Sequence, residues 1–163
     1  MLWRQLSESG RPFHESETFN VAMVSPLSKP TVVLADDHSG ILTVVSMLLA
    51  GAFDVVCMVG DGAKAVQAVA DLNPDVVVLD IGMPVMDGIQ AAYRLKDLGF
   101  TAKVVFLTLR ADTDCIEVAY TIGASCVLKA RMYSDLVTAI NEALSGRFFF
   151  SSPLHGLVSP NPI

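Results

Sequence analysis

The sequence predicts an α/β fold in which helices cover both faces of one parallel sheet of five strands. Five short β-branched runs alternate with stretches whose apolar residues recur at helical spacing. The runs are continuously apolar, which is typical of strands buried on both faces. Because a helical stretch follows every run, we expect right-handed crossovers between parallel strands.

Each element can be placed along the chain. The predicted strands are Thr31–Ala35, Asp54–Val59, Asp75–Leu79, Lys103–Leu107 and Ser125–Leu128. The helical stretches after them are marked by apolar faces, in order Ile41/Val44/Val45/Leu48/Leu49, Ala63/Val66/Val69/Ala70, Ala91/Leu95/Leu98, Ile116/Ala119/Ile122 and Leu136/Ile140/Ala143/Leu144. Helix-terminating residues stand where these helices should end, namely Gly51, Pro74, Gly99, Gly123 and Gly146.

The chain is expected to form one domain between two less ordered ends. Residues 1–29 show no sustained helical or strand periodicity, and they are predicted to be a flexible N-terminal extension. Residues 151–163 are rich in proline and serine, and they are predicted to be a tail or the start of a linker. The domain itself should occupy residues 30–150.

Composition excludes several classes of protein. The formal net charge is −6, with no basic stripe, which disfavours direct binding to DNA or to an anionic membrane. No apolar run approaches the roughly 20 residues of a membrane span. The three cysteines lack the Cys-x-x-Cys spacing of a zinc site or a disulfide framework. We expect a cytoplasmic domain with reduced thiols.

Polar residues that could carry chemistry stand at the ends of the predicted strands. Asp36 and Asp37 follow the first strand, Asp80 the third, Thr108 the fourth and Lys129 the fifth. In an open parallel sheet the ligand site lies beyond the carboxyl ends of the strands. These side chains should therefore converge on one edge.

Their chemistry suits a phosphate and a cation. Carboxylates held close together repel one another and tend to bind a proton or a cation. An all-oxygen set favours a hard divalent ion such as Mg²⁺, which leaves coordination positions for a phosphate. Lys129 and Thr108 could bind phosphate oxygens, and one aspartate could act as nucleophile toward a phosphoryl group. His38 is interpreted as the start of the first helix rather than as a metal ligand.

Four segments together resemble the receiver domain of two-component response regulators. They are DDH at 36–38, LDIGMPVMDG at 79–88, FLT at 106–108 and GASCVLK at 123–129. The resemblance covers about residues 30–146 and is strongest to the NarL/FixJ subfamily. It implies a flavodoxin-like, doubly wound (βα)5 fold with strand order 2-1-3-4-5.

The resemblance also implies a signalling phosphoacceptor rather than an enzyme. A histidine kinase would transfer a phosphoryl group to Asp80. Mg²⁺ would be held directly by Asp37 and Asp80, through water by Asp36, and by the backbone carbonyl of Gly82.

Further roles follow from the same resemblance. Lys129 would pair with the phosphoryl oxygens, and Thr108 would move toward them. Pro84 and Gly88 would shape the loop after the phosphoacceptor. The movement would switch a surface made by the helix after Thr108, the fifth strand and the last helix, for homodimerisation or partner docking. NarL/FixJ chains continue into a DNA-binding domain, which we do not find in this chain, so no nucleic-acid partner is predicted for it.

One segment departs from the family pattern. Receivers usually have an aromatic residue three positions before the lysine, where this chain has Cys126, and the segment from Gly123 to Lys129 is one residue shorter. The exact placement of Lys129 is left open by this difference. Tyr120 or Phe106 could supply the aromatic part of the switch.

Two alternatives are kept. The first is a pseudo-receiver that is not phosphorylated and acts as a protein-binding module. The second is a dinucleotide-binding domain, because Gly60, Gly62 and Ala65 fit G-x-G-x-x-A between a strand and a helix, with Asp80 twenty residues on. In the nucleotide interpretation the set at the other strand ends stays unexplained, and glycines that make a tight turn are the simpler account.

Overall fold

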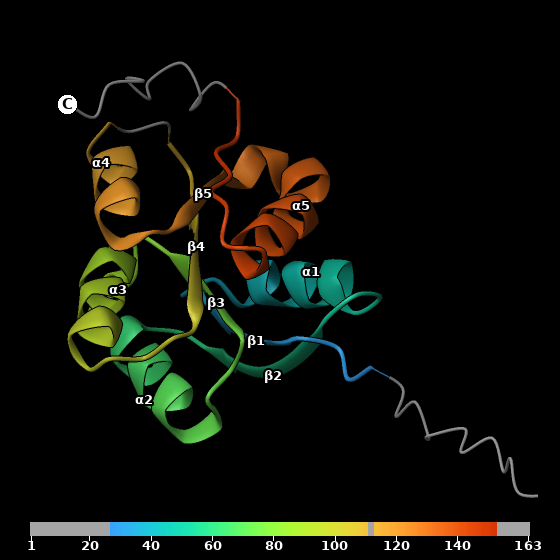
Figure 1. The fold of residues 1–163 in the computed structure, drawn as a ribbon, viewed down its shortest axis with the longest axis horizontal. Coiled ribbons are helices and arrows are strands. Elements are labelled where there is room, and N and C mark those ends of the chain that lie inside the picture. Colours follow the sequence, from blue (N-terminus) through green and yellow to red (C-terminus); the bar gives the residue numbers. More distant parts are fainter. Residues whose placement is uncertain (1–26, 111–112, 153–163) are drawn as a thin grey trace, which may run out of the picture.

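The fold is that of one parallel sheet between two layers of helices (Figure 1). The computed structural model describes residues 27–110 and 113–152, so most of the predicted N-terminal extension and of the predicted tail lies outside the described residues. The strands are β1 Thr31–Ala35, β2 Asp54–Val59, β3 Val76–Asp80, β4 Lys103–Thr108 and β5 Ser125–Leu128. The helices are α1 Ser39–Leu49, α2 Gly62–Leu72, α3 Gly88–Asp97, α4 Thr113–Ile122 and α5 Met132–Leu144, with a 3-10 turn η1 at Lys129–Arg131.

The sheet has the predicted order, β2-β1-β3-β4-β5, and every pair of neighbouring strands is parallel. Helices α2, α3 and α4 cover one face, and α1 and α5 cover the other (Figure 1). Two separate apolar clusters fill the spaces between sheet and helices. The predicted strands agree with the observed ones to within one residue at each end.

The prediction that all five strands are buried on both faces is wrong for β2. Val56 is 38% exposed and Met58 is 50% exposed. β2 lies at the edge of the sheet, where it pairs with β1. The helices cover the centre of the sheet more completely than its edge, so β2 remains partly accessible despite its apolar sequence.

The loop after β3 is tied to the start of α2 by a backbone contact that needs glycine. The amide of Gly62 donates a hydrogen bond to the carbonyl oxygen of Met86, at 2.9 Å. A Cβ atom on Gly62 would lie 2.3 Å from that oxygen, and one on Gly88 would lie 2.2 Å from the carbonyl oxygen of Asp80. Backbones can therefore approach this closely only because both positions lack a side chain.

After α5 the chain returns to the sheet. Residues 147–151, which we call the strap, run parallel to β5 through a bridge between Cys126 and Phe150. The amide of Cys126 donates to the carbonyl oxygen of Phe149 at 2.9 Å, and the amide of Ser151 donates to the carbonyl oxygen of Cys126 at 3.1 Å. The strap thus covers the edge of the sheet that β5 would otherwise leave unpaired.

A buried carboxylate anchors the strap to α5. The hydroxyl of Ser151 donates to Oδ2 of Asp135 at 2.7 Å and accepts from the amide of Leu128 at 3.2 Å. Burial raises the pKa of Asp135, but hydrogen bonds from Arg131, Ser134 and Ser151 outweigh it and lower the pKa to about 2. Ser151, which the sequence analysis places in the tail, is fully buried and hydrogen-bonded within the domain.

We expect Gly62→Ala to lower the free energy of unfolding by about 2 kcal/mol, because the new methyl group forces the α2 start and the β3–α3 loop apart. Gly60→Ala is the matched control, since a Cβ there meets nothing within 4 Å. Urea denaturation of both variants measures the difference. Equal stabilities would contradict the close approach as the reason for glycine at 62.

We expect Asp135→Asn to lower the free energy of unfolding at pH 7 by about 1–2 kcal/mol. A carboxyl group whose pKa is lowered in the native state stabilises it above the unfolded pKa, and this stabilisation is lost as the pH falls from about 4 to about 2. The gap between variant and wild type should therefore close over that range in acid titrations of stability. Asp97→Asn, on the exposed end of α3, is the control, and a gap independent of pH would contradict the assignment.

Candidate functional site

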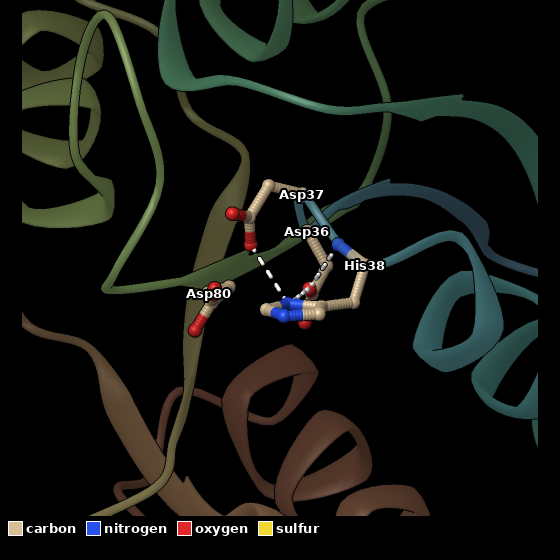
Figure 2. A group of neighbouring side chains, drawn as sticks. All are labelled: Asp36, Asp37, His38 and Asp80. Atoms are coloured by element: carbon tan, nitrogen blue, oxygen red, sulfur yellow. Dashed lines mark hydrogen bonds and ion pairs between the residues drawn. The ribbon is translucent and has the colours of Figure 1, made fainter.

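Acidic side chains from the ends of β1 and β3 meet at the carboxyl edge of the sheet (Figure 2). Asp36 follows β1 and Asp80 ends β3, and both are buried, while Asp37 is more accessible. One ligand atom each from Asp36, Asp37, His38 and Asp80 lies within 4.8 Å of the others. The predicted convergence of the three aspartates is therefore observed.

His38 has two roles in the structure. It precedes α1 as its N-cap residue, as the sequence indicated. Its imidazole also turns toward the acidic cluster, with Nδ1 at 2.9 Å from Oδ1 of Asp37 and 3.3 Å from Oδ1 of Asp36 (Figure 2). The sequence interpretation missed the second role, because a residue at a helix start can point in several directions.

Lys129 reaches the cluster from the end of β5. Its Nζ lies 2.6 Å from Oδ2 of Asp36 and 3.2 Å from Oδ1 of Asp80. Thr108 pairs with Leu128 in the parallel register of β4 and β5, which puts the following lysine just beyond the strand end. The shortened segment before Lys129 therefore does not displace it.

The charges in this cluster depend on each other. Burial and the charge of Asp36 raise the pKa of Asp80, and Lys129 partly offsets them. Burial lowers the pKa of Lys129, but the two carboxylates outweigh it, so the net pKa is raised. The ammonium group consequently stays charged and holds the negative site together.

A cavity of about 410 Å³ opens beside Asp80. Thr108 and Lys129 line it, together with His38, Ile81, Gly82, Ile89, Leu109, Arg110 and Cys115. The Thr108 hydroxyl donates to the carbonyl oxygen of Arg110 at 3.2 Å and accepts from the Arg110 amide at 3.3 Å. Thr108 thus lines the same space as Asp80, with its hydroxyl bonded to the backbone two residues further on.

The loop after Asp80 has an unusual conformation. Met86 donates from its amide to the carbonyl oxygen of Pro84 at 2.8 Å, and Gly88 donates to that of Ile81 at 3.1 Å. Val85, which lies between Pro84 and Met86, has φ 68° and is 88% exposed. A β-branched residue rarely adopts positive φ, so the backbone at Val85 is strained.

Cys126 contacts a second cysteine. Its Sγ lies 3.2 Å from Sγ of Cys115 at the start of α4, and both thiols are buried. Hydrogen bonding with Cys115 and burial raise the pKa of Cys126, which keeps it a neutral thiol. Phe106 is fully buried in the core, whereas Tyr120 stacks on Phe150 of the strap with ring centroids 5.2 Å apart.

The residues present fit a hard divalent cation. Oδ2 of Asp36 is buried and, apart from its ion pair with Lys129, has no hydrogen-bond partner among the described residues. Such an oxygen has a lone pair available for coordination. Asp37 and Asp80 add carboxylate oxygens within reach, which is the donor type that Mg²⁺ prefers.

The G-x-G segment has a structural explanation. The Asp61 side chain accepts a hydrogen bond from the amide of Lys64 at 2.8 Å and caps α2. Gly62 is in close contact with Met86, so this backbone is occupied by the protein itself. The interpretation as a tight turn into a helix is confirmed, and the G-x-G segment no longer supports the dinucleotide-binding alternative.

Comparison with known proteins agrees with this geometry. Residues 32–141 match the response regulator receiver domain family. The chain belongs to this family. A putative transcriptional regulator of Pseudomonas aeruginosa is 33% identical over 121 residues, covering 73% of this chain and 58% of the relative. PdtaR of Mycobacterium tuberculosis, a transcriptional regulatory protein, is 35% identical over 130 residues, covering 78% of this chain and 62% of the relative.

Solved structures support the same assignment. The signal receiver domain of the putative response regulator NarL from Mycobacterium tuberculosis is 30% identical, with a TM-score of 0.70 over 74% of this chain and 99% of that one. A LuxR-family response regulator from Aurantimonas is 26% identical, with a TM-score of 0.74 over 79% of this chain and 94% of that one. The receiver chain spans about three-fifths of the length of the two curated relatives above.

No helix within residues 27–110 and 113–152 of this receiver domain combines the length and apolar character needed to cross a membrane.

Strap residues and their anchor Asp135 were not among the predicted site residues. The apolar run Phe148–Phe150 was the available signal, since three exposed phenylalanines would be unusual in a linker.

We expect Lys129→Met to lower the free energy of unfolding by about 3 kcal/mol at neutral pH, because it leaves the Asp36 and Asp80 carboxylates without a counter-charge. Added Mg²⁺ should recover part of the loss. Chemical denaturation with and without Mg²⁺ measures both effects, and Lys103→Met at the exposed start of β4 is the control. Equal stabilities of the two variants would contradict the role given to Lys129.

Proposed function

We propose that this receiver domain accepts a phosphoryl group on Asp80 from a phosphohistidine of a histidine kinase. The observation that carries the proposal is the ion pair between Lys129 and Asp80 at 3.2 Å, beside a cavity that can admit the donor. The match to the family supports a role in two-component signalling. We propose a phosphoacceptor that takes part in its own modification rather than an enzyme acting on a separate substrate.

In the proposed transfer, an oxygen of the Asp80 carboxylate attacks phosphorus. The bond between phosphorus and the imidazole nitrogen breaks, and that nitrogen keeps the electron pair. Lys129 is close enough to pair with a phosphoryl oxygen while it remains near Asp36. The carboxylate must be ionised to attack. Burial and the charge of Asp36 raise its pKa, and the neighbouring ammonium partly offsets this rise.

Asp36, Asp37 and Asp80 would hold Mg²⁺, with the backbone carbonyl of Gly82 as a further ligand. When bound, the ion would supply positive charge to the oxygens of the transferring group. Pro84 and Gly88 would keep the loop after Asp80 in its shape, which the contact of Gly88 with the Asp80 backbone supports.

The response would start at Thr108, whose hydroxyl lines the same cavity as Asp80. Its exchange of the Arg110 backbone for a phosphoryl oxygen would shift α4 and so the surface of α4, β5 and α5. We propose that this surface serves a protein partner or a second copy of the chain. An acidic net charge of −6 supports a protein rather than DNA as its partner.

A small-molecule phosphodonor with Mg²⁺ should add about 80 Da to the protein, the mass of one phosphoryl group replacing a proton. The adduct should be absent in Asp80→Asn and present in Asp54→Asn, which alters a carboxylate at the opposite end of the sheet. Intact-protein mass spectrometry measures it. An unmodified wild-type protein would favour the pseudo-receiver, and an adduct that survives in Asp80→Asn would place the acceptor elsewhere.

A further inference from the structure

The strap contacts α4 through aromatic rings. Tyr120 of α4 stacks on Phe150 with ring centroids 5.2 Å apart, and Phe148 lies at a tilt with its centroid 5.8 Å from that of Tyr120. Phe150 is 3% exposed, and it belongs to the apolar cluster between the sheet and α2, α3 and α4. The position of α4 is therefore coupled to the docking of the strap.

The strap is also joined to β5 along its length. In addition to the two backbone hydrogen bonds with Cys126, the amide of Phe149 donates to Oγ of Ser125 at 3.1 Å. Arg147 at its start pairs with Glu142 of α5. The strap thus touches all three elements of the surface that we propose as the output of the domain.

A short covalent and hydrogen-bonded path leads from the strap to the phosphoacceptor site. Ser151 accepts a hydrogen bond from the amide of Leu128, whose neighbour in the chain is Lys129. Leu128 pairs in register with Thr108 on β4. A movement of Thr108 and α4 toward Asp80 therefore reaches the strap from two sides, through β5 and through Tyr120.

We propose that the strap is an autoinhibitory contact, which holds α4 and β5 in the unphosphorylated arrangement and is released when Asp80 is phosphorylated. This inference rests on the function proposed above. The strap contacts form while the Thr108 hydroxyl is bonded to the Arg110 backbone. If a shift of Thr108 and α4 breaks these contacts, they stabilise the arrangement in which they form, and the strap opposes the switch.

The proposal has a consequence for partner binding. The strap occupies the open edge of β5 and the aromatic surface of α4, so a partner that docks on this face must displace it. By thermodynamic reciprocity, weakening the strap must strengthen the binding of a phosphoryl mimic by the same factor as the mimic weakens the strap.

Hydrogen exchange of the full chain tests the release directly. The amides of Cys126 and Ser151 bond across the strap and report on its opening, whereas the amide of Val78 in central β3 is a control. With Mg²⁺ and beryllofluoride bound, as checked by fluorine NMR, exchange at Cys126 and Ser151 should become faster by roughly fivefold or more. Val78 should be unchanged.

The outcomes separate the two proposals. Bound beryllofluoride with unchanged or slower exchange at Cys126 and Ser151 overturns the strap inference and leaves the phosphoacceptor function intact. Failure to bind beryllofluoride overturns the phosphoacceptor function, and the strap inference falls with it.

A variant gives an independent measure of the same coupling. Tyr120→Ala removes a ring that is 46% exposed, so the domain should still fold, and Tyr93→Ala on α3 removes one that is 38% exposed and has no described strap contact. Beryllofluoride should bind several-fold more tightly to Tyr120→Ala and equally to Tyr93→Ala. Unchanged or weaker binding to Tyr120→Ala would overturn the inference.

Discussion

The ammonium group of Lys129 holds together two buried carboxylates that would otherwise repel one another. Asp36 and Asp80 come from adjacent strands, and Lys129 comes from the far edge of the sheet. Because all the strands are parallel, the carboxyl ends of β1, β3 and β5 lie on the same side of the sheet, where these three side chains meet. Removing the ammonium would leave two buried carboxylates without a counter-charge, whereas removing one carboxylate would leave a matched pair.

Much of this arrangement could be predicted from sequence because it follows from local patterns. Apolar β-branched runs located the strands, and the rule for parallel sheets placed Asp36, Asp80 and Lys129 together. The same reasoning failed for β2, whose apolar sequence resembles that of a central strand. Its edge position follows from the strand order, which the family resemblance implies but the apolar pattern of β2 alone does not.

The strap was missed for a similar reason. Its contacts join Ser151 to Asp135 and Leu128, and Phe150 to Tyr120, over separations in sequence that no periodicity marks. Cys126 illustrates a second limit. Its departure from the family pattern was visible, but only the structure shows that its thiol contacts Cys115 while an aromatic pair forms beside it.

The shape of the loop that follows Asp80 is set by contacts within the protein. The carbonyl oxygen of Met86 accepts a hydrogen bond from the Gly62 amide, Gly88 lies against the Asp80 backbone, and Val85 adopts a disfavoured positive φ. Conformational entropy is therefore already lost during folding rather than at binding. The oxygens of this loop would be preorganised for a cation. The affinity of the loop for a cation should then reflect electrostatics and dehydration more than ordering of the chain.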